Sequence, residues 1–364
     1  MPIYIHQLPH WPRFVWDHER VTPLLAEVRN QQGRLLGRME GLSFQLRAEA
    51  NLDILTLDVL KSSEIEGELL NADQVRSSIA RKLGMDIAGV IPSDGVVEMH
   101  IDATQQYHHP LSADRLFGWH ALLFPTGRSG MHKITVAAWR DNKKDDPMQV
   151  VSGAMGREKV HFQAPDADRL NEEMRHFLNW FNEDNYMDPV IKAAIAHLWF
   201  VTIHPFDDGN GRIARAISDL QLSRADQSAL RFYSMSAQIR KERKEYYDIL
   251  DHTQKGSMDI TEWISWFLHC LNRAIGASSE NLSTVLKKAR FWEKHANTNL
   301  NTRQRFMLNK LFDGFEGKLT SSKWATLTKT SPDTALRDIQ DLINKRILVN
   351  EVGGGRSTSY ELIY

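Results

Sequence analysis

The chain has 364 residues, of which 42% are hydrophobic and 25% are charged, and its formal net charge is −1. This composition is typical of a globular protein with two or three domains, and the near-zero charge excludes a global attraction to nucleic acid or membranes. The single cysteine, Cys270, excludes an internal disulfide and a cysteine-based zinc site. The sequence opens without the pattern of a secretory signal and has no run of about 18 apolar residues, so we expect a cytoplasmic protein with no membrane partner.

Residues 1–95 are predicted to form an N-terminal helical extension. Apolar residues recur at helical spacing over residues 21–47, and Thr22 is the predicted cap, followed by Pro23 in the first turn. A second helical pattern covers residues 50–67 and is interrupted by glycine at its end.

Residues 96–295 are predicted to form the core of the chain. Turn residues flank two short β-type runs, MQVVSG and EKVHF, which predict a hairpin at about residues 147–163. The helical period then returns, and the helix predicted from DPVIKAAIAHLWFVTI leads directly into HPFDDGNGRIAR at residues 204–215.

The stretch HPFDDGNGRIAR has the residue types of an anion-binding helix start. Such a start leaves its first N–H groups unpaired and carries partial positive charge. Gly209 and Gly211 leave the backbone open to a phosphate, and Asn210 can cap the helix or point its amide at phosphate oxygens. Arg212 and Arg215 lie three residues apart, so they share a helix face and can clamp a polyphosphate.

The same stretch also holds a base and acids. Asp208 is placed to hold Mg²⁺, which takes one or two carboxylates plus phosphate oxygens. His204 is the proton acceptor of the set near neutral pH, and Phe206 is expected in the core below the loop. The alternative is a capped helix start whose surface arginines pair with Asp207 and Asp208, but it does not explain why base, acids, glycines and paired cations converge.

The stretch resembles the Fic motif, HPFx(D/E)GNGRxxR, at every specified position. The helix and hairpin before it resemble the Fic core over about residues 100–270. The resemblance implies a mostly α fold, a Fic helical core with a small β-hairpin flap. It also implies Mg²⁺-dependent transfer of AMP from ATP to a Ser, Thr or Tyr hydroxyl of a target protein. The Doc branch, with its kinase-like reaction, carries Lys at position 211 and Ala at 209, so the two glycines here favour nucleotide transfer.

The resemblance assigns roles residue by residue. It makes His204 the base that deprotonates the target hydroxyl and Asp208 the Mg²⁺ ligand at the α- and β-phosphates. The expected ATP ligands are the amides of the glycine-rich turn and the two cations, with the second cation on the γ-phosphate: Gly209, Asn210, Gly211, Arg212 and Arg215.

The stretch SSEIEG at residues 62–67 fits the Fic inhibitory signature (S/T)xxxE(G/N) through Ser62, Glu66 and Gly67. The first two share a helix face and the glycine suits a helix end. The resemblance implies an inhibitory helix at about residues 50–67, whose Glu66 pairs with Arg215 in place of the γ-phosphate and makes ATP bind unproductively. The alternative is a surface glutamate near an ordinary helix end.

The resemblance also makes the hairpin a flap on which target backbone docks as an added strand. The candidate docking residues are Val151, Ser152, Gly153, Val160 and His161, and the alternative is a plain surface hairpin. Further on, Tyr246 or Tyr247 can stack near adenine, and Tyr247 is the predicted ATP contact; the alternative for either is a core tyrosine.

Residues 300–364 resemble a winged helix-turn-helix module, with three helices followed by a hairpin that has a Gly-rich tip. They hold ten Lys or Arg against seven Asp or Glu, a modest positive excess. Residues 318–360 could therefore meet DNA, with four candidate contacts: Thr334, Arg337, Lys345 and Arg356. A protein-interaction or packing module is the alternative.

The main expectation is an adenylyltransferase that releases pyrophosphate, is inhibited by its own Glu66, and modifies target proteins and itself; a homodimer is compatible with it. Two alternatives remain open. One keeps the site but removes AMP or transfers another nucleotide, with Glu66 supporting the removal. The other is a DNA-binding regulator whose core only senses nucleotide, although a pure sensor has no need of a base such as His204.

Overall fold

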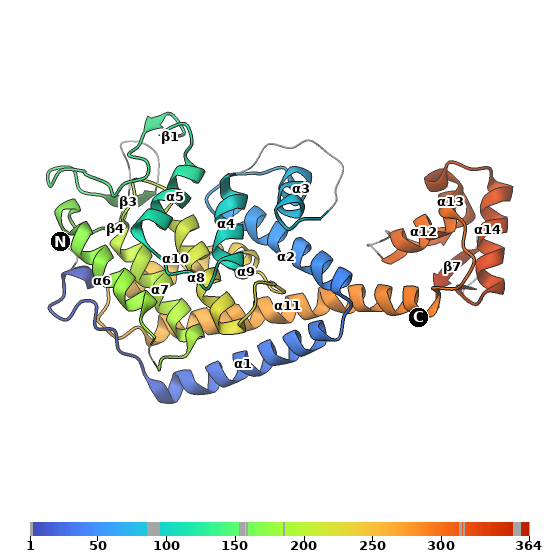
Figure 1. Cartoon of the computed structure of the whole chain (residues 1–364), viewed down its shortest axis with the longest axis horizontal. Helices are drawn as coiled ribbons and strands as arrows, with labels where there is room; N and C mark the ends of the chain where they lie inside the picture. Colours follow the sequence, from blue (N-terminus) through green and yellow to red (C-terminus); the bar gives the residue numbers. More distant parts are fainter. Residues whose placement is uncertain are drawn as a thin grey trace. The chain divides into compact units, whose positions relative to one another are not determined.

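The computed structural model describes residues 3–85, 95–152, 157, 159–184, 186–312, 315, 317–351 and 358–363. The chain divides into two compact units, Met1–Ser278 and Ser279–Tyr364 (Figure 1). The division falls within the long helix α11 (Thr261–Lys294), and the predicted N-terminal extension belongs to the same unit as the core.

Helices dominate the first unit, as predicted. In chain order they are α1 (His18–Glu40), α2 (Phe44–Ile65), α3 (Ala72–Lys82), α4 (Gly95–Gln105), α5 (Ala113–Leu123), α6 (Leu170–Asn182), α7 (Pro189–Ile203), α8 (Asn210–Asp226), α9 (Met235–Lys241), α10 (Arg243–Gln254) and the first part of α11. Two short 3₁₀ turns, Ile5–Gln7 and Ala167–Arg169, complete the helical elements of its described residues.

The start of α1 differs from the prediction. Asp17, and not Thr22, is the N-cap, and its carboxylate accepts hydrogen bonds from the amides of Glu19 and Arg20. Pro23 consequently lies inside the helix, where the prediction placed it at the start. The prediction of Thr22 as the cap is therefore wrong, because an acidic cap was available one turn earlier.

The break between the first two helices also falls earlier than predicted. α1 ends at Glu40, and Ser43 caps α2 by accepting a hydrogen bond from the amide of Leu46. The helix that carries the inhibitory signature is thus longer at its start than residues 50–67, and it ends at Ile65 with Glu66 as its C-cap.

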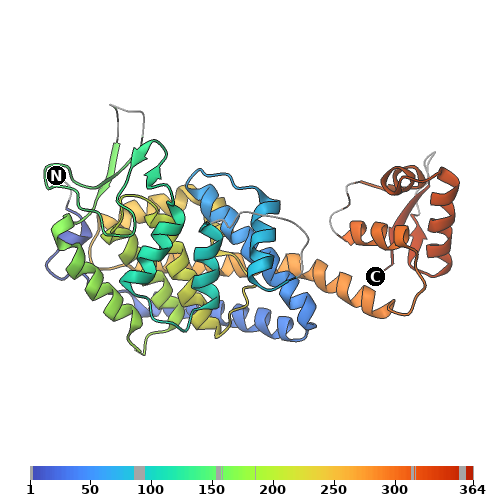
Figure 2. The same cartoon turned by 45° about the horizontal axis from the view of Figure 1, so that its top comes forward.

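The centre of the first unit is the helix pair α7 and α8, which pack against each other (Figures 1 and 2). α7 is buried from Val190 to Ile203, and it begins with Asp188 as N-cap and Pro189 in the first turn. A wholly buried helix holds its C-terminal end rigidly. The loop between α7 and α8 is HPFDDG at residues 204–209, and the rest of the motif begins α8, so this pair positions the predicted site.

Two antiparallel strand pairs accompany these helices. β1 (Arg128–Ser129) pairs with β2 (His132–Lys133), and β3 (Gln149–Ser152) pairs with β4 (Lys159–Gln163). The second pair lies where the sequence predicted a hairpin, and its register shifts between Val150 and Val151. Gly153, one of the candidate docking residues, lies outside the described residues.

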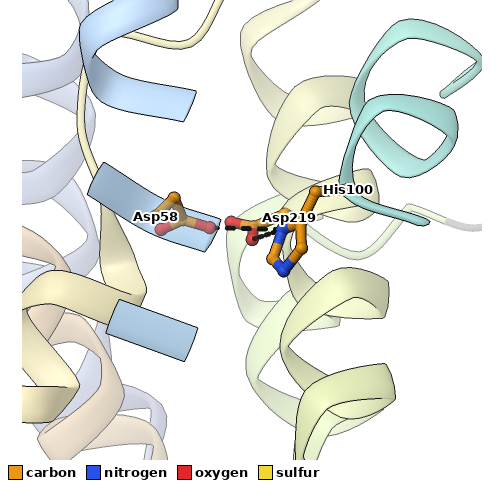
Figure 3. A group of neighbouring side chains, drawn as sticks. All are labelled: Asp58, His100 and Asp219. Carbon is orange, nitrogen blue, oxygen red and sulfur yellow. Dashed lines mark ion pairs between the residues drawn. The ribbon is translucent and has the colours of Figure 1, made fainter. Parts of the chain in front are cut away.

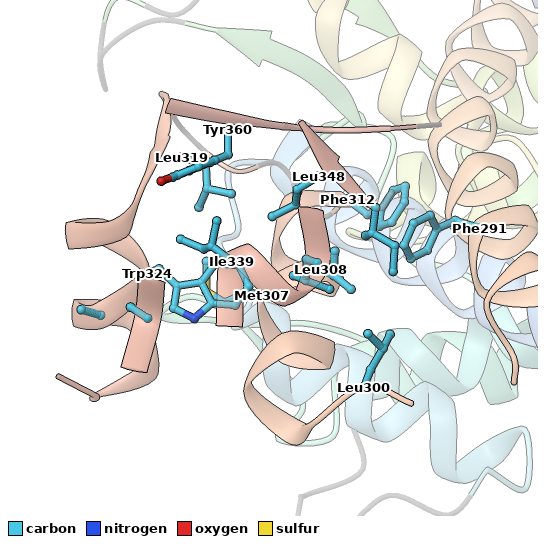
Figure 4. Packing of buried hydrophobic residues seen from close by; sticks show 14 residues of the cluster. Phe291, Leu300, Met307, Leu308, Phe312, Leu319, Trp324, Ile339, Leu348 and Tyr360 are labelled. Atoms are coloured by element: carbon cyan, nitrogen blue, oxygen red, sulfur yellow. The ribbon is translucent and has the colours of Figure 1, made fainter. Parts of the chain in front are cut away.

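The second unit contains α12 (Thr302–Phe312), α13 (Ser321–Thr328) and α14 (Pro332–Asn344), besides the end of α11. Its antiparallel sheet has the order β5 (Leu319–Thr320), β7 (Ser359–Leu362), β6 (Leu348–Asn350). Its core includes the fully buried Trp324, Met307, Leu308 and Ile339, which pack between the helices and the sheet (Figure 4).

Several cations of this unit are neutralised by ion pairs within it. Lys345 pairs with Asp341 and also donates to the Asn299 carbonyl, and Thr334 exchanges a hydrogen bond with Ser331. Of the four candidate DNA contacts, these two are thus engaged, Arg337 is exposed, and Arg356 lies outside the described residues.

Among the residues that the structure describes, no helix combines the length and apolarity needed to cross a bilayer.

Candidate active site

The loop between α7 and α8 turns the chain through two left-handed residues. His204, the C-cap of α7, has a φ of 52°, and Gly209, the N-cap of α8, has a φ of 82°. Glycine adopts this conformation without steric cost. A Cβ on Gly209 would also lie 2.9 Å from Cε2 of Phe124, so both the backbone and the packing require glycine there.

The loop is held from below by side chains. Asn210 donates from Nδ2 to the Phe206 carbonyl and accepts at Oδ1 from the Phe206 amide. Gly209 is the N-cap of α8, so the prediction that Asn210 caps this helix is wrong. The contact of Asn210 with a phosphate stays a prediction. Phe206 is fully buried, as predicted, and stacks on His120 with 4.2 Å between ring centroids. Neither a motif nor a periodic pattern marks His120 in the sequence.

His204 is held through both its ring and its backbone carbonyl. Its Nδ1 lies 3.2 Å from the Val201 carbonyl, and its own carbonyl accepts from Arg140 Nε at 2.8 Å. A carbonyl only accepts hydrogen bonds, so Nδ1 carries the proton and Nε2 keeps a free lone pair. Burial, together with the charge of Arg140, lowers the pKa of His204 to about 4, although the Val201 contact, Asp208 and Glu66 act in the opposite direction. The imidazole is therefore neutral near pH 7.

Arg140 is a structural residue of the loop that the sequence did not reveal. It is buried, its amide donates to the Pro205 carbonyl at 2.9 Å, and its guanidinium also donates to the Pro165 carbonyl. Arg140 thus connects the start of the loop, at His204 and Pro205, to the segment that follows β4. Burial lowers the pKa of Arg140 to about 10, a value at which the group still carries its charge.

The two loop acids contact the segment around β1 and β2. Asp208 accepts at Oδ2 from the Ser129 hydroxyl and at Oδ1 from the Gly209 amide. Asp207 accepts from the Thr135 amide at 2.8 Å. The two motif arginines pair with other acids, so the alternative of a surface Arg–Asp cluster is not what the loop forms. A single, partly exposed carboxylate at Asp208 fits a Mg²⁺ whose remaining ligands are phosphate oxygens and water.

The end of α2 meets the start of α8 through Glu66 and Arg215. Arg215 Nη2 lies 2.7 Å from Glu66 Oε1, and it also donates to the Ser62 carbonyl at 2.9 Å. Its Nε donates to the Ser62 hydroxyl at 2.9 Å. The Arg215 side chain is 2% exposed and that of Glu66 is 32% exposed, so a movement of Glu66 would uncover the cation. Gly67, with a φ of 87°, turns the chain away immediately afterwards.

Gly211 makes room for this carboxylate. A Cβ on Gly211 would lie only 2.4 Å from Glu66 Oε1 and 3.3 Å from Arg215 Nη1. The Glu66 carboxylate thus lies against the first turn of α8, where unpaired N–H groups and the helix dipole favour an anion. The position that the sequence predicted for a phosphate is held by a side chain of the same protein.

The other motif cation has its own acidic partner. Arg212 Nη1 lies 2.8 Å from Glu68 Oε2, and its guanidinium lies over the Phe124 ring, 5.1 Å from the centroid. The sequence did not single out Glu68, because it lies in the segment that follows the end of α2.

A cavity of about 520 Å³ opens beside Glu66 and Gly211, and its volume lies within the usual size range of ligand sites. It brings together two histidines, two acids and three aromatic residues from distant parts of the chain. Its lining consists of Glu66, Val150, Val151, Ser152, His161, Phe162, Val201, His204, Gly211, Arg243, Tyr246, Tyr247, Leu250, Asp251 and Gln254. Among the described residues, several other predicted site residues lie outside this lining: Ser62, Gly67, Asp208, Gly209, Asn210, Arg212, Arg215 and Val160.

The two tyrosines of α10 have different environments. Tyr246 is 2% exposed, and its hydroxyl lies 2.9 Å from His197 Nε2, as expected of a core tyrosine. Tyr247 is 38% exposed at the cavity, with Arg243 over its ring at 5.3 Å. Arg243 Nε also donates to the Ile65 carbonyl at 2.8 Å, so it fastens the end of α2. In the sequence Arg243 is one of several basic residues in a row, and nothing marked it.

β3 and β4 form one side of the cavity. Val151 and Val160, which face each other across the pair, are 48% and 39% exposed. The Ser152 hydroxyl lies 2.6 Å from Nε2 of His161. These strands thus present exposed apolar side chains next to His204 and Glu66.

Two segments of the first unit match known protein families. Residues 110–222 match the profile described as Fic/DOC family, and residues 4–85 match a domain of unknown function, DUF4172. A protein adenylyltransferase Fic of Aedes aegypti is 32% identical over 135 residues, which are 36% of this chain and 25% of that protein. Its namesake in Culex quinquefasciatus is 25% identical over 222 residues, 60% of this chain and 40% of that protein.

The chain therefore spans between a quarter and two-fifths of the length of these relatives. The crystal structure of a Fic family protein from Desulfovibrio desulfuricans G20 matches 97% of this chain and 98% of its own, with a TM-score of 0.55 and 21% identity. At this identity the likeness concerns the fold. Residues 110–222, which include the motif at residues 204–215, are thus similar to the Fic/DOC family.

Proposed function

We propose that this protein transfers AMP from ATP to the hydroxyl of a Ser, Thr or Tyr side chain of a target protein, and that Glu66 keeps this activity low. The observation that carries the proposal is the 2.7 Å contact between Glu66 and Arg215 at the start of α8, beside a cavity that Glu66 and the neutral His204 line. The names of the curated relatives, protein adenylyltransferase, support the same reaction.

ATP would bind where Glu66 now lies. Once Glu66 has moved, the first amides of α8 and the side chains of Arg212 and Arg215 can take the phosphates, with the γ-phosphate on Arg215. Asp208 would hold Mg²⁺, which neutralises phosphate charge when it is bound. Tyr247 is the partly exposed ring in the cavity that could stack on adenine.

His204 then acts as the general base. Its Nε2 takes the proton of the target hydroxyl while that oxygen bonds to the α-phosphorus, and the bond from phosphorus to the pyrophosphate oxygen breaks. The Val201 carbonyl holds the proton on Nδ1, so the accepting nitrogen is fixed. The negative phosphates beside the ring would raise its pKa from about 4, which strengthens the base when ATP is present.

The target would approach along β3 and β4. Both strands reach the cavity through Val151, Ser152 and His161, so a target segment paired with them would bring its hydroxyl toward His204. The β3–β4 pair is therefore the proposed docking flap for the target.

The position of the radioactive label in ATP distinguishes the candidate reactions. We expect the Glu66→Gly protein with ATP labelled at the α-phosphate to label protein, itself included, and His204→Ala in that background to reduce the rate by about 100-fold or more. Label transferred from the γ-phosphate would contradict the proposal. Loss of AMP from a pre-labelled protein with the wild type, and not with Glu66→Gly, would favour AMP removal at the same site.

DNA binding by the second unit is less well supported. Lys345 and Thr334 are engaged within the unit, and the exposed face of α14 includes the apolar Leu336 and the acidic Asp333. Affinity for DNA usually requires a larger set of cations on one face. A salt-dependent rise in the fluorescence anisotropy of labelled duplex DNA on adding the protein would show that the second unit binds DNA despite these contacts.

A further inference from the structure

Below the Glu66–Arg215 contact, α2 and α8 meet a second time at buried acids. Asp58 lies two turns before Glu66 on α2, and Asp219 lies one turn after Arg215 on α8, so the two helices run antiparallel along this line. Asp58 is 5% exposed and Asp219 is 1% exposed. We call the contacts of residues 58, 62 and 66 with residues 215 and 219 the α2–α8 seam.

The carboxyl groups of Asp58 and Asp219 face each other with His100 of α4 beside them (Figure 3). His100 Nδ1 lies 3.5 Å from Asp58 Oδ2 and 3.9 Å from Asp219 Oδ2, and all three atoms lie within 4.8 Å of one another. One oxygen of each carboxyl group lies within this distance, and Asp219 Oδ2 has no hydrogen-bond partner among the described residues. Two buried carboxyl groups this close repel each other when both are ionised, which favours a proton on one of them.

The outer oxygens are held by fixed donors. Asp58 Oδ1 accepts from the Ser234 hydroxyl and from the Ser236 amide at 3.2 Å. Asp219 Oδ1 accepts from Arg231 Nη2 at 2.9 Å. These donors leave only the two inner oxygens to meet across the seam, so the carboxyl groups have one geometry in which they can share a proton.

Charge determines which group is protonated. Burial and the Asp58 carboxylate raise the pKa of Asp219 well above its ordinary range. Despite burial, His100, the facing Asp219 carboxyl group and the hydrogen bond from Ser234 hold the pKa of Asp58 below its ordinary value. Asp219 is therefore the group that carries the proton. Burial lowers the pKa of His100, although the Asp58 carboxylate acts in the opposite direction. The charged and titratable groups around the pair are His100, Arg215, Arg231 and Asp226.

We propose that Asp58 is a positioning residue for autoinhibition: by sharing a proton with Asp219 it fixes the register of α2 on α8, and this register brings Glu66 onto Arg215. The inference rests on the proposed function. Loss of the shared proton would place two negative charges opposite each other inside the protein, and α2 would be repelled from α8. Because the folded-state pKa of Asp219 is raised, the contact is intact at low pH and is lost as pH rises through that pKa.

The test measures AMP transfer in four proteins, with Asp58→Ala made in the wild type and in Glu66→Gly. We expect Asp58→Ala to raise the rate about fivefold in the wild type, a typical size for a coupling between distant residues, and to leave the Glu66→Gly rate nearly unchanged. Asp53→Ala is the matched control, since Asp53 is an acid on the same helix that pairs with Arg76 at the surface. A residue that only supports stability would lower the rate in both backgrounds, and that result would overturn the proposal.

A conservative variant adds a pH readout. In Asp58→Asn the amide can donate to the Asp219 carboxylate and its oxygen can still accept from Ser234, so we expect inhibition to be restored. The AMP-transfer rate of the wild type divided by that of Glu66→Gly should rise with pH. The same ratio measured with Asp58→Asn present in both proteins should not change with pH. Equal pH profiles of this ratio with and without Asp58→Asn would overturn the shared proton. A metal analysis that finds one bound divalent ion per chain in the wild type, and none in Asp58→Asn, would overturn it as well.

Hydrogen exchange separates this inference from the proposed function. We expect faster amide exchange over residues 60–68 in Asp58→Ala than in the wild type or Asp53→Ala, whatever the reaction. If Glu66→Gly transfers no AMP but this exchange increases, the proposed reaction fails and the positioning role stands. Unchanged exchange over these residues would overturn the positioning role itself.

Discussion

Arg212 Nη1 lies 2.8 Å from Glu68 Oε2, one helical turn from the contact between Arg215 and Glu66. Both cations of the Fic motif are thus paired with acids from the segment at the end of α2. A nucleotide that uses both arginines must displace two carboxylates. The pairs differ in exposure, because the Glu68 side chain is 47% exposed and that of Glu66 is 32% exposed.

We predict that Glu68→Gln raises AMP transfer by no more than about fivefold, since exposed ion pairs contribute about 1 kcal/mol or less. The change removes the charge and keeps the size of the side chain. Initial rates with α-labelled ATP measure the effect, and Glu64→Gln is the control, because Glu64 pairs with Lys61 and Arg240 outside the motif. A slower Glu68→Gln protein would show that this glutamate aids the reaction.

Gly211→Ala should displace Glu66, because the new Cβ would lie 2.4 Å from its Oε1. Because the obstructing atom ends a flexible side chain and a helix favours Ala over Gly, we expect it to lower the free energy of unfolding by only about 1 kcal/mol or less. The loss should be clearly smaller when Glu66→Gly has already removed the carboxylate. Urea unfolding of the two single variants and the double variant measures this coupling, and additive losses would contradict the close approach.

His204 should be neutral near pH 7, with its proton on Nδ1. The prediction follows from the Val201 contact and from the pKa of about 4. NMR of ¹⁵N-labelled histidine distinguishes the two neutral tautomers, and His204→Asn assigns the signal. A proton on Nε2 would contradict the proposed base.

The lowered pKa of His204 also makes the stability of the folded protein depend on pH. The unfolded chain protonates His204 near its ordinary pKa of 6.5, whereas the folded chain does so near 4. The stability that depends on neutral His204 is therefore fully present above pH 6.5, and it is lost as pH falls toward 4. We expect the urea midpoint to fall over this range less steeply in His204→Asn than in the wild type; parallel curves would argue against the shift.

Tyr247→Ala in the Glu66→Gly background should raise the KM for ATP by about 10-fold, since stacking of a base on an aromatic ring contributes about 1–3 kcal/mol. Tyr247→Phe keeps the ring and should leave KM nearly unchanged. A loss in kcat alone, with KM constant, would place adenine elsewhere.

Local chemistry in the sequence predicted the loop but not what surrounds it. His204, Asp208, Gly209 and Gly211 lie within one turn, so their types and spacing were enough to predict a site. Arg140 is 64 positions from His204 in the chain, and neither periodicity nor a motif marks such a contact. Ser129 and His120 reach Asp208 across similar separations.

The helix starts show the same limit. Asp17 and Thr22 are both good caps by residue type. The choice falls on Asp17 because tertiary contacts fix the chain before it: its amide donates to Thr261 Oγ1 at 2.8 Å, and the Val15 amide donates to the Met258 carbonyl at 2.9 Å. Contacts of this kind form only after distant segments have met, so propensity could not rank the two caps.

The central claim is that Glu66 suppresses AMP transfer by occupying Arg215, and initial rates from α-labelled ATP test it most directly. A hydrogen bond to a charged partner contributes about 1.5–3 kcal/mol, so Glu66→Gly should react roughly 10- to 100-fold faster than the wild type. Glu64→Gly, a change at the same helix end, should stay within about twofold of the wild type. Equal rates for Glu66→Gly and the wild type, with both proteins folded, would contradict the account.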